Sequence, residues 1–156
     1  TALCKMVINL AGSLTALVGF PDVPLDDRGA LPRLLSTLLA EGVAVLRAEG
    51  VHDVRVRGTP PWRLLEASAV LPRFLTRPVF EKNLGKMQKS SLAQDLERGA
   101  SETELDAIHG ALLGLADRNH MAVPVMRTVY ALCKARMIPG EFVPMRVSEV
   151  DRAIAS

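Results

Sequence analysis

Hydrophobic residues recur at steps of three and four along most of this chain. The pattern runs through residues 2 to 18, 31 to 49, 62 to 75, 102 to 119 and 124 to 137. A period near 3.6 places the apolar side chains of each segment on one side of an α-helix, where they can pack against a core. We therefore expect a helix in each of these ranges, with one central hydrophobic helix among them.

Two shorter helices and several helix ends are also predicted. Residues 88 to 97 and the C-terminal "SEVDRAIAS" can each form a short helix, the latter capped by Ser148. Gly50 is placed to cap the second long helix, Pro72 to kink or end the third, and Gly99 to break the short one.

The remaining segments contain no pattern typical of an α/β fold. "VHDVRVRGTPP" alternates briefly, but its prolines favour a connector over a strand. There is no glycine-rich turn between a strand and a helix and no phosphate-binding loop, so most of any nucleotide site would lie elsewhere. We expect a single all-α domain of about six or seven helices over residues 1 to 156.

Composition excludes several classes of function. The 19 basic and 17 acidic residues are well mixed, which disfavours nucleic-acid binding, and no apolar run reaches the roughly 20 residues of a membrane span. Cys4 and Cys133 are far apart and indicate a reduced, cytoplasmic protein. His52, His109 and His120 are scattered, and no metal-ligand spacing joins them, so we expect no metal site.

Three polar residues fall on one side of the first predicted helix. Lys5, Asn9 and Ser13 are spaced four apart, an arrangement that can bind a small oxygen-rich molecule. The alternative is an ordinary solvated helix face, with Lys5 in water and Asn9 bonded to nearby backbone.

A second polar group lies in "KSSLAQDLERGASETELDAIHG", residues 89 to 110. Ser90, Ser91 and Glu104 could face a polar substrate, but serines beside a helix start are usually caps. Ser101 followed by Glu104 matches a capping box, which would by itself account for Glu104. His109 follows on the same helix, where a surface or core polar role fits better than that of a base.

Three stretches carry a resemblance to a known family. "CKMVINLAGSLTALVG", "LLAEGVAVLRAEG" and "SSLAQDLERGASETELDAIHGALLGLADRNHMAVPVMRTVYALCK" occur in that order. They resemble the C-terminal domain of ketopantoate reductases (2-dehydropantoate 2-reductases), whose helical fold resembles the 6-phosphogluconate dehydrogenase C-terminal domain. The most specific parts are the serine pair with its Gln-Asp, the later Thr-Glu-hydrophobic-Asp with its following Gly, and the Lys-x-x-x-Asn of the first helix.

This resemblance implies an oxidoreductase of two domains. An N-terminal Rossmann domain, absent from this chain, would bind NADPH, and a 2-keto acid would sit in the cleft between the domains. The implied reaction reduces ketopantoate to pantoate for coenzyme A synthesis in the cytoplasm, and the isolated C-terminal domain is expected to be inactive. A second copy of the same protein, forming a homodimer, is a further expected partner.

The resemblance also assigns roles to individual residues. Lys5 matches the family's catalytic lysine, which polarises the ketone and protonates the developing alkoxide. Glu104 matches a glutamate near that lysine, and Asn9 an amide that orients the substrate's hydroxyl end. Ser91 matches a serine that binds the substrate carboxylate, with Ser90 beside it.

Three positions depart from the family pattern. Ser13, taken as a substrate contact, stands where an asparagine is frequent, and Leu3 replaces an aromatic residue. The spacer "LERGASE" is one residue longer than in some relatives, which could shift Glu104. Substrate identity therefore stays open among 2-keto acids.

A second reading is a helical dimerisation or binding module without chemistry of its own. Apolar helix faces such as those of residues 105 to 116 and 125 to 132 can serve a partner as well as a core. On that reading Lys5, Asn9, Ser91 and Glu104 would not converge.

Overall fold

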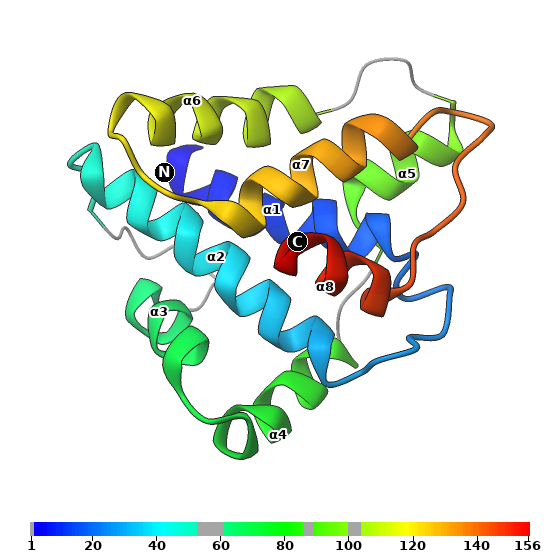
Figure 1. Ribbon diagram of the computed structural model, residues 1–156, viewed down its shortest axis with the longest axis horizontal. Coiled ribbons are helices and arrows are strands. Elements are labelled where there is room, and N and C mark those ends of the chain that lie inside the picture. The colour runs from blue at the N-terminus through cyan, green and yellow to red at the C-terminus, as the bar shows by residue number, and fades with distance from the viewer. Residues whose placement is uncertain (1, 53–60, 86–88, 100–103) are drawn as a thin grey trace.

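The computed structural model describes residues 2–52, 61–85, 89–99 and 104–156. Over these residues the chain forms eight α-helices and one π-helical turn and contains no strand, which confirms the all-α prediction (Figure 1). The elements are α1 Ala2–Leu17, α2 Ala30–Ala48, α3 Trp62–Val70, α4 Arg73–Leu84, α5 Ser91–Glu97, the π-helical turn η1 Asp106–Gly110, α6 Ala111–Arg118, α7 Pro124–Arg136 and α8 Val147–Ala155. None of the described helices is long and apolar enough to cross a membrane.

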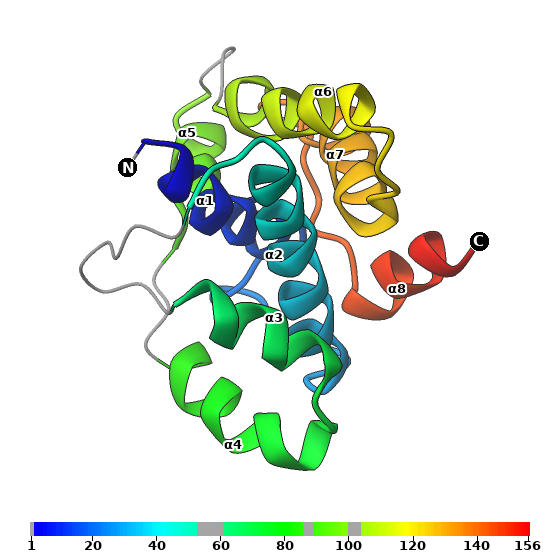
Figure 2. The ribbon, with the colours of Figure 1, turned by 90° about the vertical axis from the view of Figure 1, so that its left-hand side faces the viewer.

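Helices α1 and α2 form the centre of the fold. Helix α2 contacts α1, α3, α6, α7 and α8, and Figure 2 shows α1 and α2 between α6–α7 on one side and α3–α4 on the other. The two central helices approach closely at Gly42, where a Cβ atom would lie only 2.6 Å from Cδ1 of Leu10. The leucines and valine on the facing side of α1 are fully buried: Val7, Leu10, Leu14 and Leu17.

Glycine and proline mark most helix ends where the sequence predicts them. Gly50 adopts a positive φ of 78° after α2 and its N–H bonds the carbonyl of Arg47, and Gly99 adopts 74° after α5. The predicted connector 51 to 61 and the start of the helix predicted from residue 88 fall partly outside the described residues.

The prediction for residues 62 to 84 is incomplete. Pro72 ends the third helix, as one of the two alternatives proposed, because Leu71 before it is extended (ψ 149°). The chain then forms α4, which we did not predict, so the fold has more helices than expected. The pattern of α4 is hard to recognise because Pro78 lies inside it and three of its large apolar side chains, Phe74, Leu75 and Val79, are exposed.

Ser148 is not the cap of the last helix. It is the second residue of α8, and its hydroxyl donates to Asp26 at 2.5 Å. The Asp26 carboxylate, from the loop before α2, also accepts the backbone N–H of Val147 at 2.8 Å. The cap therefore comes from a residue more than a hundred positions away, which a local pattern cannot reveal.

Helix α7 is capped in the same way by Glu41 of α2. The Glu41 carboxylate accepts the backbone N–H groups of Val125 at 3.1 Å and Met126 at 2.7 Å. Burial raises the pKa of Glu41, and the two hydrogen bonds act in the opposite direction. This contact joins α2 to the start of α7.

The helix predicted over residues 102 to 119 is not a continuous α-helix. Residues 106 to 110 form η1, which inserts an extra residue per turn before α6 begins. The turn brings His109 into the core, where it is fully buried and packs edge-on against Tyr130, with the two ring centres 5.8 Å apart. The core polar role considered for His109 is thus confirmed.

His109 is held as a neutral ring. Neither ring nitrogen has a hydrogen-bond partner among the described residues, and burial lowers the pKa of the imidazole to about 4. Nearby, Tyr130 donates to Asp106 at 2.5 Å and Lys134 donates to it at 3.1 Å, which lowers the pKa of that carboxyl.

Replacing Glu41 by alanine is predicted to lower the free energy of unfolding by about 1–3 kcal/mol, because two partly buried N–H groups lose their acceptor. Chemical denaturation measures this change. The exposed Glu141→Ala variant is the control and should stay within about 0.5 kcal/mol of the parent. Equal effects of both substitutions would show that the cap adds no stability.

Acid should destabilise the protein through His109. The pKa of His109 is about 4 in the folded protein, against an ordinary value of 6.5 that applies to the unfolded chain. As the pH falls, the unfolded chain therefore takes up the proton first. The free energy of unfolding should therefore drop by about 3 kcal/mol between pH 6.5 and pH 4. His109→Leu should remove this contribution, whereas His52→Leu, at an exposed position, should retain it. A parallel pH profile for both variants would refute this assignment.

Candidate functional site

A hollow of about 210 Å³ lies where α1, α5 and the start of the η1 segment meet. Helix α1 contacts both α5 and η1, so the walls come from segments about 80 positions or more apart in the chain. Five of the six predicted site residues line it: Asn9, Ser13, Ser90, Ser91 and Glu104. The fold therefore brings five polar residues from two distant parts of the sequence to one hollow.

Lys5 is the predicted residue that does not line the hollow. It is exposed and lies one helical turn before Asn9, on the same side of α1. Because side chains on a helix lean toward its N-terminus, the Lys5 side chain continues the polar row of α1 beyond Asn9 and does not close the hollow. The structure thus brings together Asn9, Ser91 and Glu104 and leaves Lys5 on the neighbouring turn.

The polar residues of the hollow differ in depth. Asn9, Ser91 and Glu104 are exposed, whereas Ser13 is only 4% exposed. Ser13 therefore offers a hydroxyl at the inner end, and the other three stand at the mouth. A small ligand could be held by polar groups at both ends.

The two serines have different roles at the start of α5. Ser90 is the N-cap, and its hydroxyl accepts the backbone N–H of Ala93 at 3.2 Å. The capping alternative therefore holds for Ser90. Ser91 is the first residue of the helix and is exposed, so its hydroxyl is the better placed of the two to meet a ligand.

Gly12 is a site residue that we did not single out from the sequence. A Cβ atom there would lie 3.1 Å from Cβ of Ser90, a tight contact that would push α5 away from α1 by a few tenths of an ångström, so the glycine favours their close approach. The available signal was a glycine between Asn9 and Ser13 in an otherwise apolar helix. Apolar walls were also not predicted: Ile8, Leu92, Leu105 and Ile108.

Some predictions at the site fall outside the described residues. These are the capping box that begins at Ser101, residues 100 to 102 of the "LERGASE" spacer, and the side chains of Leu3 and Cys4. Among the described residues, no group of three or more histidine, cysteine or acidic side chains could hold a metal ion. Cys133 is a free thiol whose burial raises its pKa to about 12.

The chain is similar to a known protein family and to individual known proteins. A profile of the family described as "Ketopantoate reductase PanE/ApbA C terminal" matches residues 1–137. A protein of Halobacterium salinarum named 2-dehydropantoate 2-reductase is 32% identical over an alignment of 142 residues, which covers 87% of this chain and 39% of that protein. YkpB of Bacillus subtilis, named an uncharacterized oxidoreductase, is 32% identical over 126 residues, or 81% of this chain and 36% of that protein.

No solved structure was found that matches the chain. The chain spans less than half the length of either relative, and the family profile describes a C-terminal segment. The chain belongs to the ketopantoate reductase family of oxidoreductases, as its helical C-terminal domain.

Proposed function

We propose that the protein containing this chain reduces ketopantoate to pantoate with NADPH, a step toward coenzyme A, and that this domain binds the substrate. The observation that carries the proposal is the hollow in which Asn9, Ser13, Ser91 and Glu104 meet, one turn from Lys5. Its volume of about 210 Å³ is small for a nucleotide and suits a small acid.

The described residues contain no glycine-rich dinucleotide turn, so cofactor binding is assigned mainly to an N-terminal Rossmann domain. NADPH supplies the hydride for the ketone carbon. The work of this chain is to hold the acid and to provide the proton that completes the alcohol.

Lys5 is the proposed proton donor. Its exposed ammonium can lie within hydrogen-bond reach of the ketone oxygen, polarise the carbonyl, and pass a proton to the oxygen as negative charge develops there. Glu104, across the mouth of the hollow, is proposed to act beside the reacting oxygen.

The other residues are proposed to position the substrate. Ser91 is assigned to the carboxylate and Asn9 to the hydroxyl end, both from exposed positions at the mouth. Ser13 would contact the substrate at the inner end, and Ser90 acts mainly by starting α5, which places Ser91.

Replacing Lys5 by alanine in the full-length protein should lower the rate of ketopantoate-dependent NADPH oxidation roughly 10²–10⁴-fold, because the proton donor is lost. The exposed Lys82→Ala variant serves as the control and should retain the parent rate. Comparable turnover by the parent protein, Lys5→Ala and Lys82→Ala would refute the proposed role of Lys5. The 156-residue domain alone should show no turnover.

The rival substrates are other 2-keto acids. If one of them is turned over with a higher kcat/KM than ketopantoate, the assignment of substrate fails while that of a 2-keto acid reductase stands. Parallel assays of Ser13→Asn show whether this inner position sets the preference. A non-catalytic helical module would show no turnover with any of these acids.

We also propose that the protein is a cytoplasmic homodimer that pairs through α3 and α4. Most of the exposed large apolar side chains of the described residues lie there: Leu64, Val70, Leu71, Phe74, Leu75 and Val79. Surrounding charges have both signs, including the Arg77–Glu81 pair, which suits two copies facing each other better than an anionic membrane. The six side chains together expose apolar area of the order of several hundred Å², approaching one side of a stable interface.

Light scattering on the full-length protein should give twice the monomer mass, and Phe74→Glu should reduce it to that of the monomer, since a charge would be buried in the interface. Val143→Glu, at another exposed apolar position, should remain a dimer. A monomeric parent protein, or a dimeric Phe74→Glu variant, would contradict pairing through this face.

A further inference from the structure

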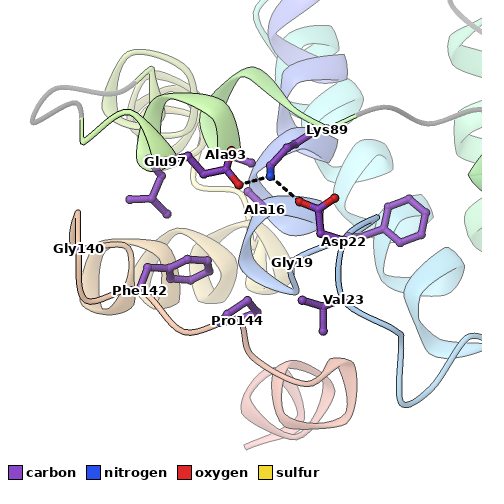
Figure 3. A pocket seen from close by; sticks show the side chains of 12 residues that line it. Ala16, Gly19, Asp22, Val23, Lys89, Ala93, Glu97, Gly140, Phe142 and Pro144 are labelled. Carbon is purple, nitrogen blue, oxygen red and sulfur yellow. Dashed lines mark hydrogen bonds and ion pairs between the residues drawn. The ribbon is translucent and has the colours of Figure 1, made fainter.

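A second and larger hollow lies on the other side of α5. Its volume is about 420 Å³, and its walls come from the end of α1, the loop that follows, α5, and the segment from residue 140 to 144 (Figure 3). This volume is within the range of small-molecule sites. Neither the family's match nor the proposed reaction assigns a role to it.

The hollow has mostly apolar walls. Phe20, Val23 and Ala16 contribute from the α1 side, and Phe142 and Pro144 from the segment before α8. In Figure 3 Phe142, Pro144 and Val23 lie below the hollow, opposite the charged side chains at its upper edge. Such walls suit an apolar or aromatic group.

Backbone contacts hold these walls in place. Gly19 has a φ of 71°, and a Cβ atom there would lie 2.8 Å from both Pro144 and Val23, so the two loops pack closely only around a glycine. The N–H of Met145 bonds the carbonyl of Leu17 at 2.9 Å, which ties the second loop to the end of α1. The hollow is therefore formed before any ligand arrives.

The charged edge consists of one lysine between two carboxylates. Lys89 donates to Asp22 at 2.5 Å and also to Glu97, and these bonds raise the pKa of the ammonium (Figure 3). Asp22 and Glu97 are 61% and 60% exposed, whereas Lys89 is 26% exposed. The edge thus has a net charge of −1, with the carboxylates turned more toward solvent than the ammonium.

This arrangement favours a cation over an anion. Asp22 and Glu97 accept two of the three N–H groups of Lys89, so an anion could accept only the third and would be repelled by both carboxylates. A ligand ammonium can instead donate to the remaining carboxylate lone pairs, and it can lie over the rings of Phe20 or Phe142.

We propose that this hollow binds a small organic ammonium that carries an apolar or aromatic group. This site is separate from the hollow between α1 and α5 that is proposed to bind the keto acid. The apolar group lies against Phe142 and Pro144, and the ammonium meets Asp22 and Glu97. Helix α5 separates the two sites, with Ser91 facing one and Ala93 and Glu97 facing the other.

The test uses the full-length protein and three probes of nearly equal shape: 2-phenylethylammonium, 2-phenylethanol and 3-phenylpropionate. Calorimetric titration at pH 7 should show saturable binding that is tightest for the ammonium and weakest for the carboxylate. The Asp22→Asn/Glu97→Gln double variant should weaken ammonium binding roughly tenfold and leave alcohol binding unchanged. The alcohol therefore reports whether the double variant retains its fold and its apolar walls.

Glu141→Gln, just outside the lining residues, is the matched control and should bind all three probes like the parent protein. Amide chemical-shift changes with the ammonium should centre on Ala16, Ala93 and Phe142. The proposal is overturned if the ammonium does not saturate, if the carboxylate binds as tightly, if the double variant keeps parental ammonium affinity, or if the shifts centre on Asn9 and Ser91.

Discussion

The close packing of α1 against α2 is the constraint on which the rest of the structure depends. Gly42 leaves room for Leu10, and with Val7, Leu14 and Leu17 fully buried, only one rotation of α1 is compatible with the core. The opposite side of the helix must then turn outward. That side contains Lys5, Asn9 and Gly12, so the packing of the core determines where the polar residues point.

A second glycine turns this outward side into a site. Beside Gly12, α5 comes close enough for Ser90 and Ser91 to face α1, and Glu104, just before η1, and Ile108, within it, line the same hollow. Caps between distant segments hold the surrounding helices: Glu41 at α7 and Asp26 at α8. At the start of α5 the two adjacent serines divide these tasks: Ser90 caps the helix, and Ser91 lines the candidate site.

Much of this could be read from the sequence because it depends on local periodicity. The helices around Leu10, Leu38 and Val129 each bury the face that their spacing predicts, and Gly50 and Gly99 end helices as expected. The candidate residues Asn9, Ser91 and Glu104 came from a family resemblance in addition to spacing, and spacing alone would not have separated them from an ordinary solvated face or a cap. Their roles in a reaction stay predictions.

What could not be read depends on tertiary contacts. The cap of α8 is the carboxylate of Asp26, far away in the sequence, and not Ser148. A single π-helical turn such as the one that buries His109 is too short for the hydrophobic pattern to distinguish it from an α-helix. Helix α4 was not predicted because Phe74, Leu75 and Val79 are exposed and do not contribute a core-facing pattern. Gly12 has meaning only once Ser90 is known to lie against it.

The central claim is that the hollow between α1 and α5 holds a 2-keto acid in front of Lys5. A crystal structure of the full-length protein with ketopantoate and the oxidised cofactor tests it most directly. The account predicts the ketone oxygen within hydrogen-bond distance of Nζ of Lys5, the carboxylate on Ser91, and Asn9 at the hydroxyl end. An acid bound elsewhere, or a Lys5 ammonium more than about 10 Å from the ketone oxygen, would contradict it.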